Sequence, residues 1–291
     1  MPELPDVAAF ESYFASSALH QHISKTSVLD KRILKDTTPG ALGRSVKGGA
    51  FEETRRHGKY LFARVDGRGW LVLHFGMTGG LEYFKRNGDV PRYGRVVFDF
   101  SSGYSLAVIS QRLFGRVGFA DDLDEFVHRQ DLGPDALGPG FTAKYLADYA
   151  AEHAVQVKSL LMDQSAVAGL GNIYADETLF QARIHPKTRT GELSKKDIAR
   201  LHRVIQRVLK TALRHDANTK QLPKTYLVRH RKKGEKCPAC GGKIETATVA
   251  GRTSYFCPKC QKAPSKEAVE YPCRLNIKCS IVMGWQLQHC R

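Results

Sequence analysis

Residues 160–177 read Leu160-Leu-Met-Asp-Gln-Ser-Ala-Val-Ala-Gly-Leu-Gly-Asn-Ile-Tyr-Ala-Asp-Glu177, a segment that ends one helix, turns through two glycines and begins a second helix. Gly169 and Gly171 let the backbone approach a phosphate closely, and the helix that follows directs free N–H groups at such an anion. Asn172 adds a side-chain donor. Spacing alone favours an ordinary helical hairpin, so the phosphate-binding interpretation depends on the rest of the chain.

Helical periodicity surrounds this segment, and strand-like sequence precedes it. Apolar residues recur at i, i+3, i+4 spacing in four ranges, 142–153, 157–164, 174–183 and 194–215. The last range opens with Ser194-Lys-Lys-Asp197, a capping box in which Asp replaces Glu or Gln. An early amphipathic helix is expected over residues 5–18. Strand formers separated by Gly-containing turns occupy 60–65, 70–74, 95–100 and 104–109, which is the spacing of hairpins in a sandwich or a barrel.

Gly and Pro punctuate residues 132–139, which indicates a linker between domains. The chain is therefore expected to be an α+β protein. Its predicted parts are an N-terminal β domain at 2–131, a linker at 132–141, a helical domain at 142–228, a small module at 229–262 and a tail of unknown role at 263–291.

Charge and composition restrict the function. The 291 residues carry a formal net charge of +16, which draws polyanions, nucleic acid first and acidic membrane surfaces second. No run approaches the roughly 20 apolar residues of a membrane span, and no signal sequence opens the chain. We therefore expect an intracellular protein that does not associate with membranes. The seven cysteines do not suggest a disulfide scaffold in a chain of this length.

Four of the cysteines predict a metal site. Cys237-Pro-Ala-Cys240 and Cys257-Pro-Lys-Cys260 are separated by sixteen residues, a distance at which two Cys-x-x-Cys pairs can bring four thiolates onto one tetrahedral zinc. Four protein ligands leave no position for a catalytic water, so one structural zinc is expected. Redox use of the pairs is the alternative. Arg252, near the predicted hairpin turn between them, is a candidate phosphate contact.

The first residues, Met1-Pro2-Glu3-Leu4-Pro5-Asp6, hold candidate catalytic groups. Removal of Met1 would leave Pro2 with a free secondary amine, and an α-amino group with a pKa near 8 is partly neutral at physiological pH. Such an amine can attack an aldehyde-like carbon to form an iminium. Glu3 beside it can move protons if its surroundings raise its pKa. Taken alone, these residues favour an ordinary N-terminal strand, so the catalytic interpretation depends on the rest of the chain.

Taken together, the N-terminal Pro2-Glu3-Leu4-Pro5, the glycine turn at 169–171 and the cysteine pairs resemble the formamidopyrimidine-DNA glycosylase and endonuclease VIII family of base excision repair, over the chain to about Gln261. The resemblance implies an N-terminal β-sandwich, a helix–two-turn–helix DNA-binding domain and a C-terminal β-hairpin zinc finger. It implies a bifunctional glycosylase and abasic-site lyase, acting as a monomer on double-stranded DNA that contains oxidised bases or abasic sites, and located with the DNA.

The resemblance also assigns roles to residues. Pro2 would attack C1′ of the damaged nucleotide, Glu3 would assist ring opening and base loss, and β and δ eliminations would follow. Lys59, in Arg55-Arg-His-Gly-Lys-Tyr60, would contact the phosphate by the lesion; a solvated lysine is the alternative. The remaining DNA-binding candidates are Asn172 and Arg252 on the backbone and the trio Met77, Arg112 and Phe114 in the space left by the extruded base. For Met77 and Phe114 the alternative is a place in the core.

Three features depart from the family. Leu4 is typical of the formamidopyrimidine branch, but Asp6 stands where that branch carries Glu, so only a supporting role is expected for it. Residues 216–226 are shorter than the Gly-rich loop that covers an everted 8-oxoguanine in typical members, which predicts weaker selection for that base and favours formamidopyrimidines or oxidised pyrimidines. The tail, with Cys273, Cys279 and Cys290, has no counterpart and matches no zinc spacing.

Two alternatives to a glycosylase/lyase of the formamidopyrimidine branch share its fold: an endonuclease VIII-like enzyme specific for oxidised pyrimidines, and a non-catalytic damaged-DNA-binding protein. A zinc-ribbon interaction protein would explain the cysteines and the charge but not the N-terminus. The combination of Pro2, Glu3 and Lys59 favours an enzyme, because binding alone requires neither a free secondary amine nor an adjacent acid.

Overall fold

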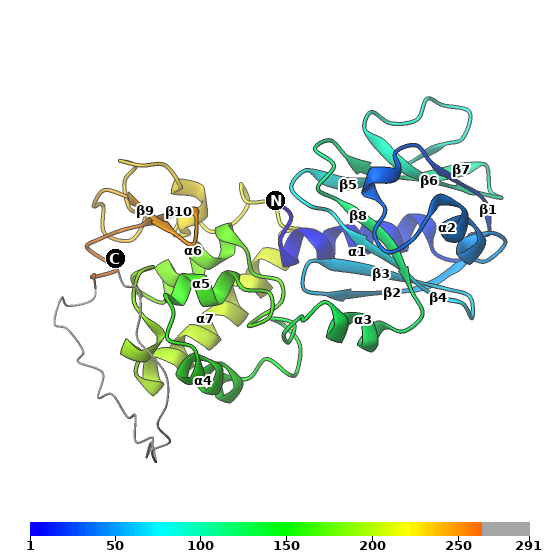
Figure 1. Cartoon of the computed structure of the whole chain (residues 1–291). Helices are drawn as coiled ribbons and strands as arrows, with labels where there is room; N and C mark the ends of the chain where they lie inside the picture. Colours follow the sequence, from blue (N-terminus) through cyan, green and yellow to red (C-terminus); the bar gives the residue numbers. More distant parts are fainter. Residues whose placement is uncertain (264–291) are drawn as a thin grey trace, which may run out of the picture.

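The computed structural model describes residues 1–263, and two antiparallel four-stranded sheets form most of its N-terminal domain (Figure 1). One sheet has the order β1-β6-β7-β5 and the other β2-β3-β4-β8. The strands are β1 (Ile23–Val28), β2 (Phe51–His57), β3 (Tyr60–Val65), β4 (Gly69–His74), β5 (Gly79–Lys85), β6 (Gly94–Phe100), β7 (Tyr104–Ser110) and β8 (Arg116–Ala120). The cysteines of the tail lie outside the described residues.

The four strands that the sequence predicts, β3, β4, β6 and β7, are the central strands of the two sheets. The four that it does not predict are the edge strands. An edge strand tolerates polar and charged residues, as in the Phe51-Glu-Glu-Thr-Arg-Arg-His57 sequence of β2, so it lacks the apolar run that marks a central strand. The expected α+β class and the sandwich are confirmed.

The two sheets enclose the first core, to which helix α1 (Leu4–Ala18) contributes Val7, Phe14 and Ala18. Phe51 of β2 is central in it, since its ring meets Phe14 edge-on at 5.0 Å and that of Phe98 at 5.6 Å. Helix α2 (Pro39–Val46) and the short η1 (Lys31–Ile33) add further apolar side chains to this core. Helix α3 (Leu123–Arg129) covers the outer face of the second sheet.

The helical domain forms a separate core. Its elements are α4 (Ala143–Glu152), α5 (Val157–Met162), α6 (Asn172–Gln181), η2 (Thr190–Glu192), α7 (Lys195–Leu213) and η3 (Leu227–His230). The predicted capping box at the start of α7 is present, with Ser194 and Asp197 bonded reciprocally. Leu4 of α1 is fully buried in this second core, so the first turn of α1 belongs by its contacts to the helical domain.

The cysteine-containing hairpin consists of β9 (Glu245–Val249) and β10 (Arg252–Phe256). It packs through Ile244, Cys237 and Cys257 onto Phe180 of α6 and Leu227 of η3. No helix among residues 1–263 is both long enough and apolar enough to cross a membrane.

The linker at 132–141 is bonded to both domains. Asp135 accepts hydrogen bonds from the Arg56 guanidinium, one of them at 3.0 Å, and from the backbone N–H of Gly58 at 2.7 Å, while Ala136 is fully buried in the helical core. His57 is hydrogen-bonded to the carbonyl of Gly133 at 2.9 Å. These contacts hold the β2–β3 turn, the segment immediately before Lys59, against the helical domain.

Replacing Asp135 with Ala should destabilise the protein, because the Arg56 and Asp135 side chains are only 13% and 11% exposed and the mutation leaves a buried cation unpaired. We expect a loss of about 3 kcal/mol and a fall in Tm of roughly 5–10 °C by scanning calorimetry. Asp148→Ala, which removes the exposed Lys144–Asp148 pair, is the matched control and should change Tm little. Equal falls in Tm for the two variants would contradict a stabilising role of the Arg56–Asp135 pair.

Candidate active site

The carboxylate of Glu3 lies at the N-terminus of α6. It accepts hydrogen bonds from the backbone N–H groups of Gly171 at 2.8 Å, Ile173 at 2.8 Å and Tyr174 at 3.1 Å, and its side chain is 1% exposed. These are the N–H groups that a helix start leaves unsatisfied, and the positive end of the helix dipole favours an anion there. The glycine turn therefore binds a carboxylate of its own chain at a position where the sequence predicts a phosphate.

Glycine is required at both positions of that turn. A Cβ on Gly171 would lie 2.5 Å from Cδ of Glu3, and a Cβ on Gly169 would lie 2.6 Å from a methyl carbon of Leu4. Gly169 also has φ of +118°, a conformation that other residues rarely adopt. The amide of Leu4 donates a hydrogen bond to the carbonyl of Gly169 at 3.0 Å, so the backbone of the N-terminal segment is bonded directly to the glycine turn.

Asp6 has a structural explanation for its supporting role. Its carboxylate accepts a hydrogen bond from the backbone N–H of Glu3 at 2.8 Å, which forms a capping box at the start of α1. This bond fixes the backbone on which Glu3 and the preceding Pro2 are carried. Burial raises the pKa of Asp6 above its usual range.

A cavity of about 350 Å³ opens beside Glu3. Its walls come from all three parts of the chain, the N-terminus, the sandwich and the helical domain with its hairpin. The lining residues are Met1, Glu3, Lys59, Met77, Met162, Gly171, Asn172, Ile173, Arg231 and Arg252. Met1 and Glu3 line the cavity and Met1 is 48% exposed; Pro2, which lies between them in the chain, is not itself a lining residue. This volume falls in the range of small-ligand sites.

Lys59 and Glu3 have perturbed titration behaviour. Burial raises the pKa of Glu3, while Lys59 and the three N–H groups act in the opposite direction. Burial lowers the pKa of Lys59, with Glu3 opposing this effect and Arg252 adding to it. Lys59 is 7% exposed, which excludes the solvated-lysine alternative. Perturbed carboxyl and amino groups that face one cavity are typical of catalytic sites.

A buried polar network joins α5, α6 and the hairpin behind the cavity. Lys158 is fully buried and contacts Asp176 at 2.7 Å, Oδ1 of Asn172 at 2.7 Å and Oγ of Ser254 at 2.7 Å. Asp176 also accepts from the backbone N–H of Tyr255 at 3.1 Å. Asn172 lines the cavity, and its side-chain oxygen is already occupied by Lys158.

Arg231 is a cavity residue that the sequence analysis does not identify. Its guanidinium donates to Asp176 at 2.7 Å and lies over the ring of Tyr255, 4.9 Å from the centroid. Glu177 fixes the preceding segment by accepting from the backbone N–H of Val228 at 2.8 Å, and burial raises the pKa of this carboxyl to about 7. Arg231 lies in a run of basic residues, so only its long-range pairing with Asp176 distinguishes it from its neighbours.

The structure separates the other predicted contacts into two groups. Met77 lines the cavity with Arg252, which is exposed at the start of β10. Arg112 and Phe114 do not line it; the Arg112 guanidinium lies 5.4 Å from the Phe114 ring centroid, and Phe114 is 54% exposed. This exposure excludes the core alternative for Phe114. A large aromatic ring on the surface is available to contact a partner.

The four cysteines form one cluster, since their sulfur atoms all lie within 4.8 Å of one another. Sγ of Cys237 is 3.8 Å from that of Cys260, and Sγ of Cys240 is 3.5 Å from that of Cys257. A tetrahedral zinc with Zn–S bonds of about 2.3 Å requires sulfur–sulfur edges of about 3.8 Å, so the donor set and its geometry fit one zinc. All four positions are taken by protein thiolates, and the site is structural.

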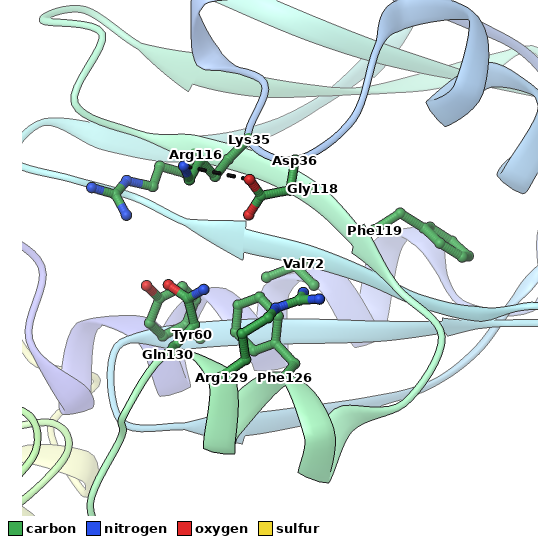
Figure 2. A pocket seen from close by; sticks show the side chains of 10 residues that line it. All are labelled: Lys35, Asp36, Tyr60, Val72, Arg116, Gly118, Phe119, Phe126, Arg129 and Gln130. Carbon is green, nitrogen blue, oxygen red and sulfur yellow. Dashed lines mark ion pairs between the residues drawn. The ribbon is translucent and has the colours of Figure 1, made fainter.

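A second cavity lies on the outer side of β3, β4 and β8 (Figure 2). It is lined by Tyr60, Arg116 and Phe126 among others, and beside it Lys35 and Asp36 form an ion pair at 3.4 Å. Its volume of about 20 Å³ accommodates little more than one water molecule, so it cannot hold a nucleobase. The cavity at Glu3 is the larger of these two, and it is the one lined by the carboxyl and amino groups with perturbed pKa values.

Comparison with known proteins agrees with this geometry. Three family models match: the formamidopyrimidine-DNA glycosylase N-terminal domain at residues 1–117, the formamidopyrimidine-DNA glycosylase H2TH domain at 132–224, and the zinc finger found in FPG and IleRS at 234–263. The formamidopyrimidine-DNA glycosylase of Symbiobacterium thermophilum is 35% identical over 281 residues, covering 92% of each chain. That of Arabidopsis thaliana is 31% identical over 283 residues, covering 92% of this chain and 73% of its own.

Solved structures with the same fold contain DNA. A MutM complex with carbocyclic 8-oxo-G containing DNA superimposes with a TM-score of 0.83 at 28% identity, over 90% of this chain and 100% of the other. A complex of Lactococcus lactis Fpg with Fapy-dG containing DNA gives 0.82 at 27% identity, with the same coverage.

Gly171→Ala should displace the Glu3 carboxylate, because the added Cβ overlaps it. We expect single-turnover base release to fall by about 100-fold, the order of a lost general acid, with DNA affinity changed much less. Gly191→Ala is the control, since nothing lies within 4 Å of a Cβ at that position. Normal base release by Gly171→Ala would show that the Glu3 position is not required.

Removing the zinc should release the hairpin from α6, because the small cluster around Phe180 is too limited to hold it without the metal. Chelation is expected to weaken DNA binding at least tenfold, measured by fluorescence anisotropy, through the loss of the Arg252 position. Added Zn²⁺ should restore binding and Mg²⁺ should not. Unchanged affinity after verified zinc loss would contradict this.

Proposed function

Because this chain belongs to the formamidopyrimidine-DNA glycosylase family, we propose that it is a bifunctional DNA glycosylase and abasic-site lyase of base excision repair that removes oxidised bases and works at the DNA. The observation that carries the proposal is the placement of Glu3: a buried carboxyl with a raised pKa that directly follows Pro2 and lines one cavity with Lys59. A binding protein needs none of these groups in one cavity.

In the proposed reaction, the Pro2 amine is the nucleophile once Met1 has been removed. Its lone pair forms a bond to C1′ of the damaged nucleotide, the bond from C1′ to the base breaks with the electron pair leaving on the base, and the proton of the Pro2 nitrogen passes to that base. Glu3 supplies a proton to the sugar ring oxygen as the ring opens, which leaves an iminium between Pro2 and C1′. Loss of a C2′ proton expels the 3′ phosphate, loss of a C4′ proton expels the 5′ phosphate, and water then frees the amine.

The cations around the cavity suit the phosphates that flank the lesion. Lys59 and Arg252 point into one space from different parts of the chain, and Arg231 joins them with its other side held by Asp176. Charge-assisted bonds to phosphate are strongest where water is excluded. We assign Lys59 to the phosphate beside the lesion, Arg252 and Asn172 to the flanking backbone, and Met77, Arg112 and Phe114 to the space vacated by the base.

The short segment at 216–226 bears on lesion choice. None of its residues lines the cavity, and its apolar members Leu222 and Tyr226 are buried in the helical core. A segment held in this way leaves an everted base without the cover that longer loops give. We therefore propose that formamidopyrimidines and oxidised pyrimidines are released faster than 8-oxoguanine.

Borohydride trapping tests the activity. Duplexes with formamidopyrimidine, thymine glycol, 8-oxoguanine or an abasic site should each give a covalent adduct that mass spectrometry maps to Pro2. Pro2→Gly, which replaces the secondary amine by a primary one, should give much less adduct with the intact damaged bases, and Glu3→Gln should release intact bases 10²- to 10⁴-fold more slowly. No adduct on any duplex, with Met1 absent and DNA bound, would leave a damaged-DNA-binding protein.

A further inference from the structure

Helix α7 carries a row of cations on its exposed face. The row, called here the cationic stripe, consists of Lys196, Arg200, Arg203, Arg207, Lys210 and Arg214, all of them exposed. Successive members are four, three, four, three and four residues apart, which aligns them along one side of a helix. At 1.5 Å per residue the stripe is about 27 Å long.

The stripe lacks the compensating charges of an ordinary solvated face. Asp197 is the one acid in α7, and it pairs with Arg200 at 2.6 Å. Within residues 1–263 the other five cations take part in no ion pair. Like charges three or four residues apart destabilise a helix, and Lys196 in the first turn also opposes the helix dipole. Surfaces that serve only solubility intersperse both signs.

The stripe is separate from the catalytic cavity, which none of its residues lines. The opposite face of α7, with Leu201, Val204 and Val208, is buried in the helical core against α4 and α6. Helix α6 in turn contacts β10, so it lies between α7 and the hairpin. Figure 1 shows α7 and α4 on the side of the helical domain away from β9 and β10.

A long, regular row of charges fits a linear polyanion better than a compact one. Duplex DNA carries one negative charge per ~1.7 Å of its axis, so a row of about 27 Å matches the backbone along roughly 8 base pairs. Arginine predominates in the stripe, and its guanidinium binds phosphate oxygens two at a time. We propose that the cationic stripe of α7 is a second DNA-binding surface. It holds the backbone of another duplex segment, without reading its sequence, while the catalytic cavity binds a lesion.

The choice of DNA as the partner rests on the proposed function, which brings this protein to DNA. The test therefore uses separate readouts. The full chain is first trapped by borohydride on a short, fluorescently labelled abasic-site duplex, so that the catalytic cavity is occupied. A second, undamaged duplex with a different fluorophore is then titrated in. Adduct formation reports the proposed function; capture of the second duplex, by fluorescence cross-correlation, reports the stripe. If no adduct forms, a tetrahydrofuran-containing duplex is used to occupy the catalytic cavity instead.

The variant is Arg203→Glu, Arg207→Glu and Lys210→Glu. The matched control makes the same charge change at Lys25, Lys31 and Lys47, which are exposed on the N-terminal domain. We expect the wild type and the control to capture the second duplex, and the stripe variant to bind it at least tenfold more weakly with unchanged base release. Three lost phosphate contacts should also lower the slope of log affinity against log salt concentration by about 2.7.

Equal capture by the stripe variant and the control would overturn the proposal, as would no capture by the wild type. Binding of the wild type to phosphatidylserine vesicles that depends on the stripe, without capture of a duplex, would overturn it in favour of a membrane surface. If the Glu variant loses base release, the corresponding Gln variant replaces it in the same comparison and decides by the same outcomes.

Discussion

The bond set between the Glu3 carboxylate and the start of α6 is the contact on which the rest of the site depends. It places the third residue of the chain on a helix that begins 169 residues later, at Asn172. The anion satisfies three N–H groups that the helix would otherwise leave unpaired, and the helix in turn offsets part of the cost of burying a carboxylate. Because the contact is so close, a side chain on Gly171 would overlap Glu3, and Leu4, the next residue along, lies in the helical core. Met1 and Glu3, on either side of Pro2, both line the cavity.

The same contact explains why the site sits between domains that have separate cores. The β2–β3 turn that carries Lys59 is held by Asp135 of the linker, so the lysine and Glu3 reach the same cavity from different elements. Burial pushes both groups toward their neutral forms, and each moderates the shift of the other. A phosphate entering the cavity adds an anion near Lys59, which favours its charged form. A DNA phosphate in the cavity thus opposes the effect of burial on the pKa of Lys59.

Much of this arrangement is predictable from local sequence, and the failures have physical causes. The central strands are predicted because both of their faces are covered and their sequences are therefore apolar runs. The edge strands are not predicted because one of their edges is exposed to water and tolerates polar residues. Pro2, Glu3 and the cysteines are found because their chemistry is unusual at their spacing, whereas Lys59 is assigned only through the resemblance to the family. Lys158 interrupts the apolar pattern of α5, which is a usable signal for a buried cation, but its partners Asp176 and Ser254 come from other elements. Arg231 gives no local signal, because pairing across 55 residues is what sets it apart.

The high positive charge of the chain divides into two populations with different physics. Lys59 is buried and lines one cavity with the buried Glu3, and Arg231 is paired with the buried Asp176, so their attraction for a phosphate acts over short distances, depends on position and is little screened by salt. The cations of the α7 stripe are exposed and, apart from Arg200, take part in no ion pair within the described part of the chain, so their attraction is weaker per contact, tolerant of position and strongly salt-dependent. Precise positioning of C1′ requires the first kind of charge. Holding a duplex segment of any sequence requires only the second, which is why an exposed, regular row serves there and a buried network serves at the cavity.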